Sequence, residues 1–324
     1  MGRSSAGYAF HDLQPETGGF LEDVLAGLAK PQKELPPKYF YDARGSELFE
    51  AICELPEYYL TRTETAIMRD HGADMASHLG SGCALIEFGS GSGRKTRILI
   101  EAAAPAAYLA IDIARDQLEA TAAELARDFP ALEVTAICAD YSGPIPLPQL
   151  SAPGGRRRAI YFPGSTIGNL TPVEARAFLR NAGGLARAGG GLLIGVDLKK
   201  ETARLNAAYN DARGITAEFN LNLLARINRE LGAAFDLSAF RHFAFYHEAL
   251  GRIEMHVVST KAQTVAVGGG VFRFRLDETI HTENSYKYSI AEFQDLGKGA
   301  GLAPIECWTD PERLFAVHYF AVPG

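Results

Sequence analysis

The middle of the chain alternates short apolar runs with amphipathic stretches. Five apolar runs have the length expected of strands, at residues 85–88, 107–111, 134–138, 158–162 and 189–197. Helical patterns at 95–103 and 117–128 separate the first three runs. Strands that read as continuous apolar runs, with helices between them, are typical of a parallel sheet covered on both faces. The pattern therefore predicts an α/β fold.

Two capping boxes mark further helices. In each box, at residues 171–174 and 289–292, a hydroxyl residue precedes a glutamate by three positions. This spacing lets the hydroxyl and the carboxylate satisfy the first free N–H groups of a helix. Two more apolar runs, 302–308 and 314–322, follow the second box and are close enough to form an antiparallel hairpin. The sheet is therefore predicted to have seven strands.

The segments outside this pattern predict a second, smaller α+β domain. The stretch between residues 199 and 286 is far longer than an ordinary connection in an α/β domain. It contains helical patterns at 203–210 and 218–231 and strand-like alternation at 253–259 and 265–275. We expect a cofactor-binding domain at residues 62–198 plus 287–324, and a substrate-binding domain at residues 8–61 plus 199–286.

A turn with three glycines on alternate positions, Gly89, Gly91 and Gly93, follows the first apolar run. A dinucleotide-binding turn needs its third glycine three places after its second, where this chain has Arg94. An alternate-glycine turn offers open backbone to a cofactor without a phosphate to grip, and S-adenosylmethionine (SAM) is such a cofactor. The turn favours SAM, although glycine-rich turns also serve as plain connections. The seven strands suit the Rossmann-like sheet of class I SAM-dependent methyltransferases.

Polar residues end the next two strands. Asp112 follows the glycine turn by about 20 residues, where a carboxylate can accept both ribose hydroxyls of an adenosine. Asp140 ends the third strand and can accept the adenine amino group, with Tyr141 beside the ring. Each aspartate has an alternative role as the cap of the following helix. Because ligands bind at the carboxyl edge of such sheets, the residues together favour cofactor binding.

Asn169 ends the segment that follows the fourth apolar run. An amide at this edge faces the methyl end of the cofactor, and its donor and acceptor atoms can orient an amine without carrying charge. Asn169 is therefore a candidate substrate ligand. The alternative is a turn residue ahead of the helix that Thr171 caps.

Composition and charge exclude several classes of protein. The net charge of -7 and the pI near 5.7 disfavour a nucleic-acid partner. No apolar run approaches the roughly 20 residues of a membrane span, and residues 1–16 lack the layout of a signal peptide, so we expect a cytoplasmic protein. The four cysteines lie far apart, and His242 and His247 are spaced for packing, so neither a disulfide nor a metal site is expected.

Motifs at residues 39–49, 55–62, 87–91, 95–97, 164–169 and 280–287 resemble those of the SAM-dependent L-histidine Nα-methyltransferases of ergothioneine biosynthesis. The resemblance covers nearly the whole chain, and Leu60, where the family often has proline, is a small departure. The cofactor contacts it implies are Gly89 with its neighbour Gly91, Lys95, Asp112, Asp140 and Tyr141. The substrate contacts it implies are Tyr58, Asn169 and Tyr209 for the amino and carboxylate groups, and Glu283 and Ser285 for the imidazole, with the variable Asn284 between them.

The reaction implied is trimethylation of the α-amino group of L-histidine, which gives hercynine in the first step of ergothioneine biosynthesis. Methyl transfer needs a neutral amine in line with the sulfonium methyl, so positioning is the main task of the candidate catalytic residues Asn169 and Tyr58. A tyrosine hydroxyl, an asparagine amide or water can guide the amine proton away. The aromatic faces of Tyr41 and Tyr58 can retain the trimethylated cation.

Selectivity for histidine needs a separate contact. The carboxylate of Glu283 can accept from an imidazole N–H, and Met255 can pack on the ring as an adaptable wall. In a purely structural interpretation, Glu283 lies on an exposed strand and Met255 fills the core. Two other hypotheses are a methyltransferase for another aromatic amino acid such as tryptophan, and a SAM-binding or NAD-binding module without catalysis. We expect a monomer whose partner is the small molecule L-histidine.

Overall fold

The computed structural model describes residues 7–13, 19–141, 143, 145, 147 and 157–324. Much of the N-terminal stretch considered above for a signal peptide, residues 1–6 and 14–16, lies outside these residues. The chain forms two compact units. The first unit consists of Met1–Pro15, Leu60–Lys199 and Lys287–Gly324, and the second of Glu16–Tyr59 and Lys200–Tyr286.

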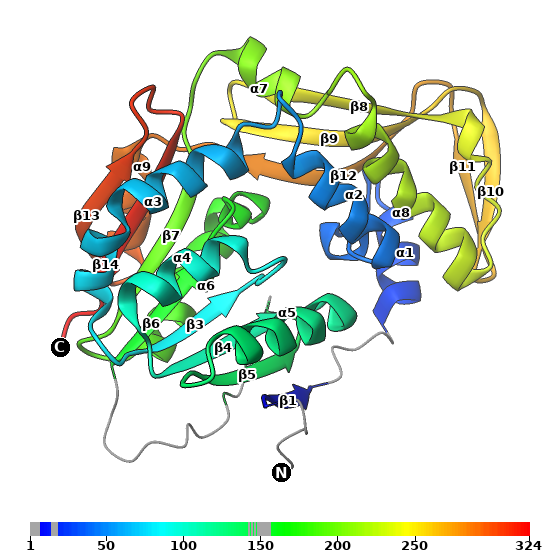
Figure 1. Ribbon diagram of the computed structural model, residues 1–324. Helices are drawn as coiled ribbons and strands as arrows, with labels where there is room; N and C mark the ends of the chain where they lie inside the picture. Colours follow the sequence, from blue (N-terminus) through cyan, green and yellow to red (C-terminus); the bar gives the residue numbers. More distant parts are fainter. Residues whose placement is uncertain (1–6, 14–18, 142, 144, 146, 148–156) are drawn as a thin grey trace. The chain divides into compact units, whose positions relative to one another are not determined.

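The first unit is built on an eight-stranded sheet with the order β1-β5-β4-β3-β6-β7-β14-β13 (Figure 1). Its strands are β1 (Ala9–Asp12), β3 (Ala84–Phe88), β4 (Ala107–Asp112), β5 (Glu133–Cys138), β6 (Arg158–Phe162), β7 (Gly191–Asp197), β13 (Ala303–Thr309) and β14 (Phe315–Ala321). The seven predicted strands are confirmed, and β13 and β14 form the predicted antiparallel hairpin. Strand β14 also pairs antiparallel with β7, whereas the remaining pairs are parallel.

The eighth strand, β1, corrects one predicted boundary. Residues 8–61 were expected in the substrate-binding domain, but Ala9–Asp12 pairs in parallel with β5 at the edge of the main sheet. Arg115 stabilises this edge, because its guanidinium lies 3.0 Å from an Asp12 carboxylate oxygen and 5.2 Å from the centre of the Phe10 ring. Four residues with mixed polarity carry too little pattern to be recognised as a strand.

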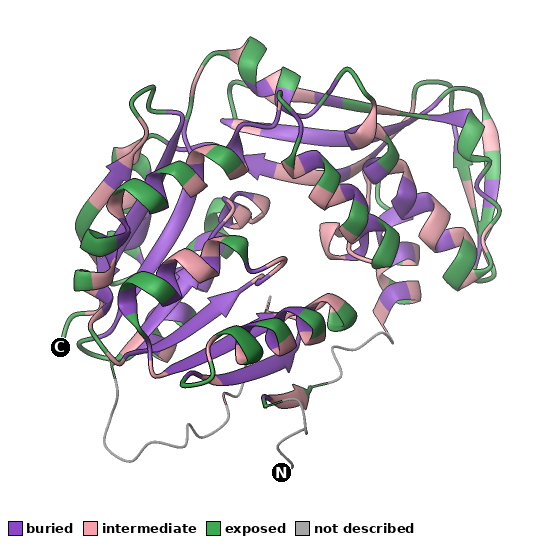
Figure 2. Cartoon of the chain, in the orientation of Figure 1, coloured by how far each residue is buried: buried purple, intermediate pink, exposed green. Residues whose placement is uncertain are grey.

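Helices cover both faces of this sheet. They are α3 (Leu60–Leu79), α4 (Arg94–Ala103), α5 (Arg115–Asp128), α6 (Pro172–Ala186) and α9 (Ile290–Gly299). From β3 the chain moves through α4 to β4 in one direction, and from β6 through α6 to β7 in the other, so right-handed crossovers place α4 and α6 on opposite faces. Strands β3 and β7 are accordingly buried along their whole length (Figure 2). Both predicted capping boxes are present, at the starts of α6 and α9.

The reversal of direction occurs between β3 and β6, the two central strands. At such a switch point the loops after neighbouring strands separate, and ligands of open α/β sheets bind there, beyond the carboxyl ends of the strands. The glycine turn follows β3, and the loop with Asn169 follows β6. The topology therefore places both predicted motifs at the position where a cofactor is expected.

Residues 200–286 are an insertion between β7 and α9, and its two ends meet in the first unit. The Lys287 ammonium lies 2.7 Å from a carboxylate oxygen of Asp197, and both side chains are completely buried. The backbone N–H of Lys199 donates to the carbonyl of Tyr288 at 3.0 Å, and the N–H of Tyr288 donates to the carbonyl of Asp197 at 3.3 Å. The chain therefore leaves and returns through adjacent, hydrogen-bonded segments.

The second unit has the α+β composition predicted for it. Its four-stranded sheet has the order β2-β12-β9-β8, and a separate hairpin consists of β10 and β11. Its elements are α1 (Phe20–Leu28), β2 (Lys33–Glu34), α2 (Ala43–Cys53), α7 (Thr202–Ala208), α8 (Ile215–Leu231), β8 (Phe240–His247), β9 (Arg252–Ser259), β10 (Gln263–Val267), β11 (Gly270–Phe274) and β12 (Thr279–Tyr286). The run at 265–275 is this hairpin rather than one strand, because Gly268 and Gly269 turn the chain with positive φ angles of 54° and 86°.

The two faces of the four-stranded sheet differ. Helix α8 packs on one face, which we call the front face: Asn220 of α8 donates to the carbonyl of His256 at 2.9 Å and lies 2.8 Å from Nδ1 of His242. His242 pairs with Val257, so Met255, two residues before Val257, also points to the front face. The intervening residues of each strand point to the opposite face, which we call the back face.

Candidate active site

The glycine turn after β3 is held in a conformation that favours glycine. Gly89, Gly91 and Gly93 have φ angles of 71°, 46° and 67°. The N–H of Gly89 donates to the carbonyl of Ile111 at 2.8 Å, which ties the turn to β4. A Cβ atom at Gly91 would meet nothing within 4 Å, so the backbone is open on that side. This open backbone fits a cofactor that lies along the turn.

Asp112, at the end of β4, closes the same turn from the other side. One carboxylate oxygen accepts from the N–H of Gly91 at 3.2 Å, and the other accepts from the N–H of Ala114 at 3.0 Å. Burial raises the pKa of Asp112, and these backbone donors oppose the shift. The contact with Ala114, just before α5, is the local turn contact that sequence reasoning offered as the alternative. The turn contact is therefore present, and the contact of Asp112 with the ribose remains a prediction.

Tyr141 lies beside the glycine turn. Its hydroxyl would be 3.4 Å from a Cβ atom on Gly89, and its ring packs edge-on against Phe88 and Phe162, with centroids 5.7 and 6.1 Å away. Burial, followed by the charges of Asp112 and Asp140, raises the pKa of Tyr141. Tyr141 therefore presents a neutral phenol beside the open turn, and its contact with adenine remains a prediction.

Glu87 lies behind the turn and was not predicted as a site residue. The buried carboxylate accepts from the hydroxyls of Thr96 at 2.7 Å and Tyr108 at 2.6 Å. Burial raises its pKa to about 8, although both hydrogen bonds act in the opposite direction. The sequence signal for this residue is a single carboxylate inside an otherwise apolar strand. It connects β3, β4 and the start of α4 beneath the turn.

A second buried carboxylate, Glu64 of α3, holds Lys95 and the loop after β6. The Lys95 ammonium forms an ion pair with Glu64, and the N–H of Gly164 donates to the same carboxylate at 2.9 Å. Glycine at position 195 makes room for this group, because a Cβ atom there would lie 2.0 Å from a Glu64 oxygen. Lys95 thus has a structural partner that the sequence did not reveal, and its predicted contact with the cofactor remains a prediction.

Asn169 is the last residue of a 3₁₀ turn, Thr166–Asn169, that follows β6. The loop is fixed by Ser165, whose φ angle is 58° and whose hydroxyl accepts from the N–H of Asp197 at 2.9 Å. The Asn169 side chain is half-buried and makes no hydrogen bond with the described residues. Asn169 is therefore a turn residue, as in the alternative interpretation, and its side-chain amide is also available to a ligand.

The second unit gathers aromatic side chains on the front face of its sheet. Tyr58 and Tyr209 are buried, and their ring centroids are 6.1 Å apart. The ring of Phe49 lies 6.4 Å from that of Tyr58, and the ring of Tyr41 lies 5.7 Å from that of Phe49. Burial, and next the neighbouring Tyr209, raises the pKa of Tyr58 well above its usual range. Tyr58 therefore carries a neutral hydroxyl at physiological pH.

The predicted imidazole contacts lie in the same cluster. Glu283 on β12 is directly opposite Met255 on β9, and Ser285 is opposite Ile253. The Tyr209 hydroxyl donates to the hydroxyl of Ser285 at 2.8 Å. Since Met255 points to the front face, Glu283 and Ser285 share this face with the aromatic rings.

Asn284 does not belong to this group. It pairs with Glu254, one residue out of phase with Met255, so its side chain points to the back face. Asn284 therefore lies on the other face from Glu283 and Ser285, and its contact with the substrate stays a prediction that this register does not favour. Three consecutive residues of a motif cannot all line one face of a strand, because neighbouring side chains point to opposite faces.

His242 packs as predicted. Its Nε2 lies 2.8 Å from the carbonyl of Tyr209, and its pKa is lowered by burial. With Nδ1 beside Asn220, both ring nitrogens have protein partners. His242 thus connects β8, α8 and the end of α7 and helps to hold Tyr209 in place.

Together, the sheet order, the open glycine turn and Asp112 define a SAM-dependent methyltransferase. The family model described as "Histidine-specific methyltransferase, SAM-dependent" matches residues 20–322. The protein belongs to this family, as the motifs predicted, and its cofactor is SAM.

Three relatives show how far the similarity extends. The chain is 42% identical over 301 residues to a histidine N-alpha-methyltransferase of Mycobacterium tuberculosis, covering 91% of this chain and 92% of that protein. It is 40% identical over 327 residues to a histidine N-alpha-methyltransferase of Mycolicibacterium smegmatis, covering 98% of both. It is 34% identical over 301 residues to ergothioneine biosynthesis protein 1 of Neurospora crassa, covering 89% of this chain but 34% of that protein.

The helices give one further finding. Within the described ranges, none combines the length and apolar character needed to cross a bilayer.

Proposed function

We propose that this protein transfers three methyl groups from SAM to the α-amino nitrogen of L-histidine. The product is Nα,Nα,Nα-trimethylhistidine (hercynine), and the reaction is the first step of ergothioneine biosynthesis. The observation that carries the proposal is the placement of Glu283 opposite Met255, on the strand face that also holds Tyr209 and Ser285. An acceptor for an imidazole N–H thus stands next to an apolar wall and a group of tyrosines.

In this proposal the first unit binds SAM and the second unit binds histidine. The glycine turn at Gly89 and Gly91 carries the cofactor, Asp112 accepts from its ribose hydroxyls, and Asp140 and Tyr141 hold the adenine. Lys95, paired with Glu64, completes this set. When bound, SAM supplies an electrophilic methyl group on a sulfonium centre.

Asn169 and Tyr58 are proposed to orient the α-amine. The Asn169 amide offers both a donor and an acceptor, and it makes no hydrogen bond with other described residues that binding would have to break. Because burial raises its pKa, Tyr58 acts as a neutral hydroxyl whose oxygen accepts from an amine N–H, so the nitrogen lone pair stays free for the methyl group, and the proton lost by the ammonium form passes to water. Tyr209 completes the set at the amino end of the substrate, because its hydroxyl oxygen can accept from the amine while its proton is donated to Ser285. Catalysis then rests on orientation rather than on an anionic base.

Glu283 is proposed to accept from the imidazole N–H, with Ser285 beside it. The hydrogen bond from Tyr209 holds the Ser285 hydroxyl in place, and this hydroxyl can still donate to the imidazole ring or accept from it. Met255 packs on the ring from β9. These contacts leave the imidazole nitrogens occupied, so the α-amine is the nucleophile presented to the methyl group.

Aromatic rings account for repeated transfer. The amine is a cation whenever it is protonated, and the third methyl group makes this charge permanent, because the trimethylated nitrogen has no N–H to lose. Tyr41 and Tyr58 offer ring faces that attract such a cation, with energies of about 0.5 to 2 kcal/mol for each favourable contact. Partly methylated product is thereby retained for the next transfer.

The test is a product analysis. Purified protein is incubated with SAM and, in parallel, with L-histidine, L-tryptophan and the other amino acids, and products are weighed and fragmented by mass spectrometry. The proposal requires a histidine product with three methyl groups on Nα and bare ring nitrogens. A ring-methylated product would contradict the orientation, and preferred methylation of tryptophan would support the alternative substrate.

We further propose that the protein acts as a monomer in the cytoplasm, without nucleic-acid or membrane partners. The negative net charge and the four free cysteines are consistent with such an enzyme. Light scattering after size exclusion, with and without SAM, measures the oligomeric state. A stable dimer would contradict this part of the proposal.

A further inference from the structure

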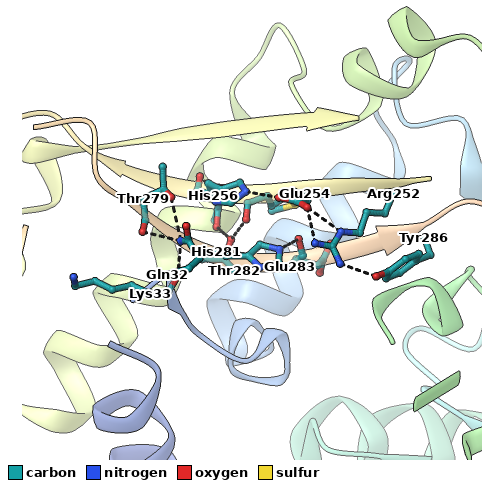
Figure 3. Close-up of polar contacts among 12 residues, drawn as sticks. Gln32, Lys33, Arg252, Glu254, His256, Thr279, His281, Thr282, Glu283 and Tyr286 are labelled. Carbon is teal, nitrogen blue, oxygen red and sulfur yellow. Dashed lines mark hydrogen bonds and ion pairs between the residues drawn. The ribbon is translucent and has the colours of Figure 1, made fainter. Parts of the chain in front are cut away.

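The back face of the four-stranded sheet carries a group of metal-ligating side chains that the methyltransferase chemistry does not use. Glu254 and His256 lie two residues apart on β9, so they point to the same face, and His281 on β12 is directly opposite His256. Figure 3 shows the three side chains next to one another. Three ligand-type groups are thus brought together from two paired strands.

The spacing of these groups suits a metal ion. One donor atom from each residue can be chosen so that all three lie within 4.8 Å of one another, and Nε2 of His256 is 3.0 Å from a Glu254 oxygen. In a tetrahedral site with bonds of about 2.1 Å, neighbouring donor atoms are about 3.4 Å apart. Two donors already have nearly this separation. The rings of His256 and His281 are stacked with centroids 4.8 Å apart, so one ring must turn before both nitrogens face a single ion, and His281 is the half-buried one of the two.

Among the described residues, each of the two histidines uses one ring nitrogen for a hydrogen bond within the protein and has the other nitrogen left. Nδ1 of His256 is buried and has no hydrogen-bond partner within the part of the chain that the structure describes. With Nε2 of His256 as the metal ligand, this Nδ1 carries the proton, and a water molecule is expected to accept from it. Nε2 of His281 lies 3.1 Å from the carbonyl of Glu283, which favours the tautomer with its proton on Nε2. The other nitrogen is then unprotonated, and a ligating histidine commonly has this arrangement.

Arg252 orients the carboxylate without using all of it. The guanidinium contacts one Glu254 oxygen at 2.6 and 2.9 Å, while the other oxygen is the one that faces His256. Arg252 also donates to the Tyr286 hydroxyl at 2.6 Å and lies over that ring, so it is anchored independently of Glu254. A nearby fixed cation weakens the attraction of the site for a metal ion, so we expect moderate affinity.

We propose that Glu254, His256 and His281 form a binding site for a divalent transition-metal ion, with zinc as the representative ion. Two imidazoles and one carboxylate favour zinc and similar metals over magnesium or calcium, which take oxygen ligands. Water fills the remaining positions. Because its ligands come from β9 and β12, a bound ion joins these strands beside the register shift between His281 and Glu283. This proposal does not depend on the substrate of the enzyme.

Zinc titration of the full-length, tag-free protein tests the site. The protein is first treated with a chelator and dialysed, and zinc binding is then measured by calorimetry for the parent, His256→Gln, His281→Gln and the matched control His247→Gln. His247 lies on the back face in β8, outside the cluster. We expect one site of moderate affinity in the parent and control, and a loss of about 100-fold or more in each cluster variant, since even outer-shell changes cost 10- to 100-fold.

A second measurement addresses folding and competing sites. Cobalt in place of zinc gives visible absorption bands that should appear in the parent and be lost in His281→Gln, whose position is the less buried of the two histidines. Circular dichroism verifies that each variant is folded. Equal zinc affinity in the parent and His281→Gln would overturn the proposal, because binding would then occur elsewhere, for example at cysteines. Failure of the parent to bind zinc would overturn it as well.

Discussion

Glu283 and Met255 stand directly opposite each other on β12 and β9, so that a carboxylate and a thioether occupy neighbouring positions on one face of the sheet. Side chains in this relation are about 4.5 to 5.5 Å apart at Cβ, which is close enough for both to face one ligand. The pair offers an imidazole both a hydrogen-bond acceptor and an apolar surface. Under the proposed function, specificity for the substrate ring rests on these two positions, which can be changed separately.

Replacing Glu283 by alanine should abolish efficient histidine turnover. The imidazole N–H loses a charged acceptor, and we expect a cost of about 2 to 4 kcal/mol in transition-state binding. Combined with Met255→Val, the change should improve turnover of tryptophan or phenylalanine relative to histidine. Values of kcat/KM for histidine and tryptophan measure the ratio. Asn284→Ala is the matched control, because its side chain points to the back face; an unchanged ratio in Glu283→Ala would remove the specificity role.

Replacing Asp112 by alanine should weaken SAM binding by about 2 kcal/mol or more, because two ribose hydroxyls lose a charged acceptor. Calorimetric titration with SAM measures the change. Asp116→Ala, on the exposed side of the first turn of α5, is the control and should bind SAM like the parent. Unchanged affinity in Asp112→Ala would show that Asp112 serves only the turn contacts with Gly91 and Ala114.

Replacing Asn169 by alanine should reduce kcat by about 100-fold, since a small misplacement of the amine has this cost. SAM affinity should stay at the parent level, because the cofactor contacts lie on other loops. Single-turnover rates and SAM titration separate the two effects. A variant with normal turnover would restrict Asn169 to the role of a turn residue.

Glu87 predicts a pH dependence of stability. Its pKa is raised to about 8 in the folded chain, against about 4.3 for an exposed glutamate, so the folded state binds the proton more tightly. The resulting stabilisation is complete below about pH 4 and is lost as pH rises toward 8, by at most about 1.4 kcal/mol per pH unit. Urea unfolding at pH 5.5, 7 and 8.5 measures this. Glu87→Gln, which keeps an acceptor for Thr96 and Tyr108, should decline less over this range; equal slopes would argue against the shift.

Glu64 predicts a combined loss of stability and activity. Alanine at this position leaves the Lys95 ammonium and the Gly164 N–H without their buried acceptor, at a cost of about 3 kcal/mol in unfolding free energy. The loop that carries Asn169 begins at this contact, so kcat should also fall. Glu101→Ala on the exposed side of α4 is the control for removing a glutamate. A Glu64→Ala variant with parental stability would contradict the role of this carboxylate.

The main sheet could be predicted from sequence because its strands are buried on both faces. Strands β3 to β7 appear as predominantly apolar runs, in β3 with the single carboxylate of Glu87, and the two capping boxes identify α6 and α9. Strand β1 escaped because its order comes from pairing with β5, a partner more than 120 residues away. Strand β12 escaped because polar side chains occupy both of its faces, which hides the alternation.

The candidate site was predicted where chemistry lies in contiguous motifs, and less well where contacts are distant. Asp112 and Tyr141 lie beside the glycine turn as expected. Glu64 was missed because its partners, Lys95 and Gly164, are 31 and 100 residues away in sequence. Asn284 was assigned to the substrate from its neighbours in a motif, although the strand turns its side chain to the other face.

The closed junction between β7 and α9 has an evolutionary consequence. The two ends of the insertion are joined within the first unit by contacts among Asp197, Lys199, Lys287 and Tyr288. The strand order of the sheet therefore does not depend on the length or content of residues 200–286. Natural selection can therefore lengthen, shorten or rewrite this excursion while the cofactor machinery stays intact. New acceptors for methyl groups can arise by exchange of one continuous gene segment, together with a few residues of the N-terminal part.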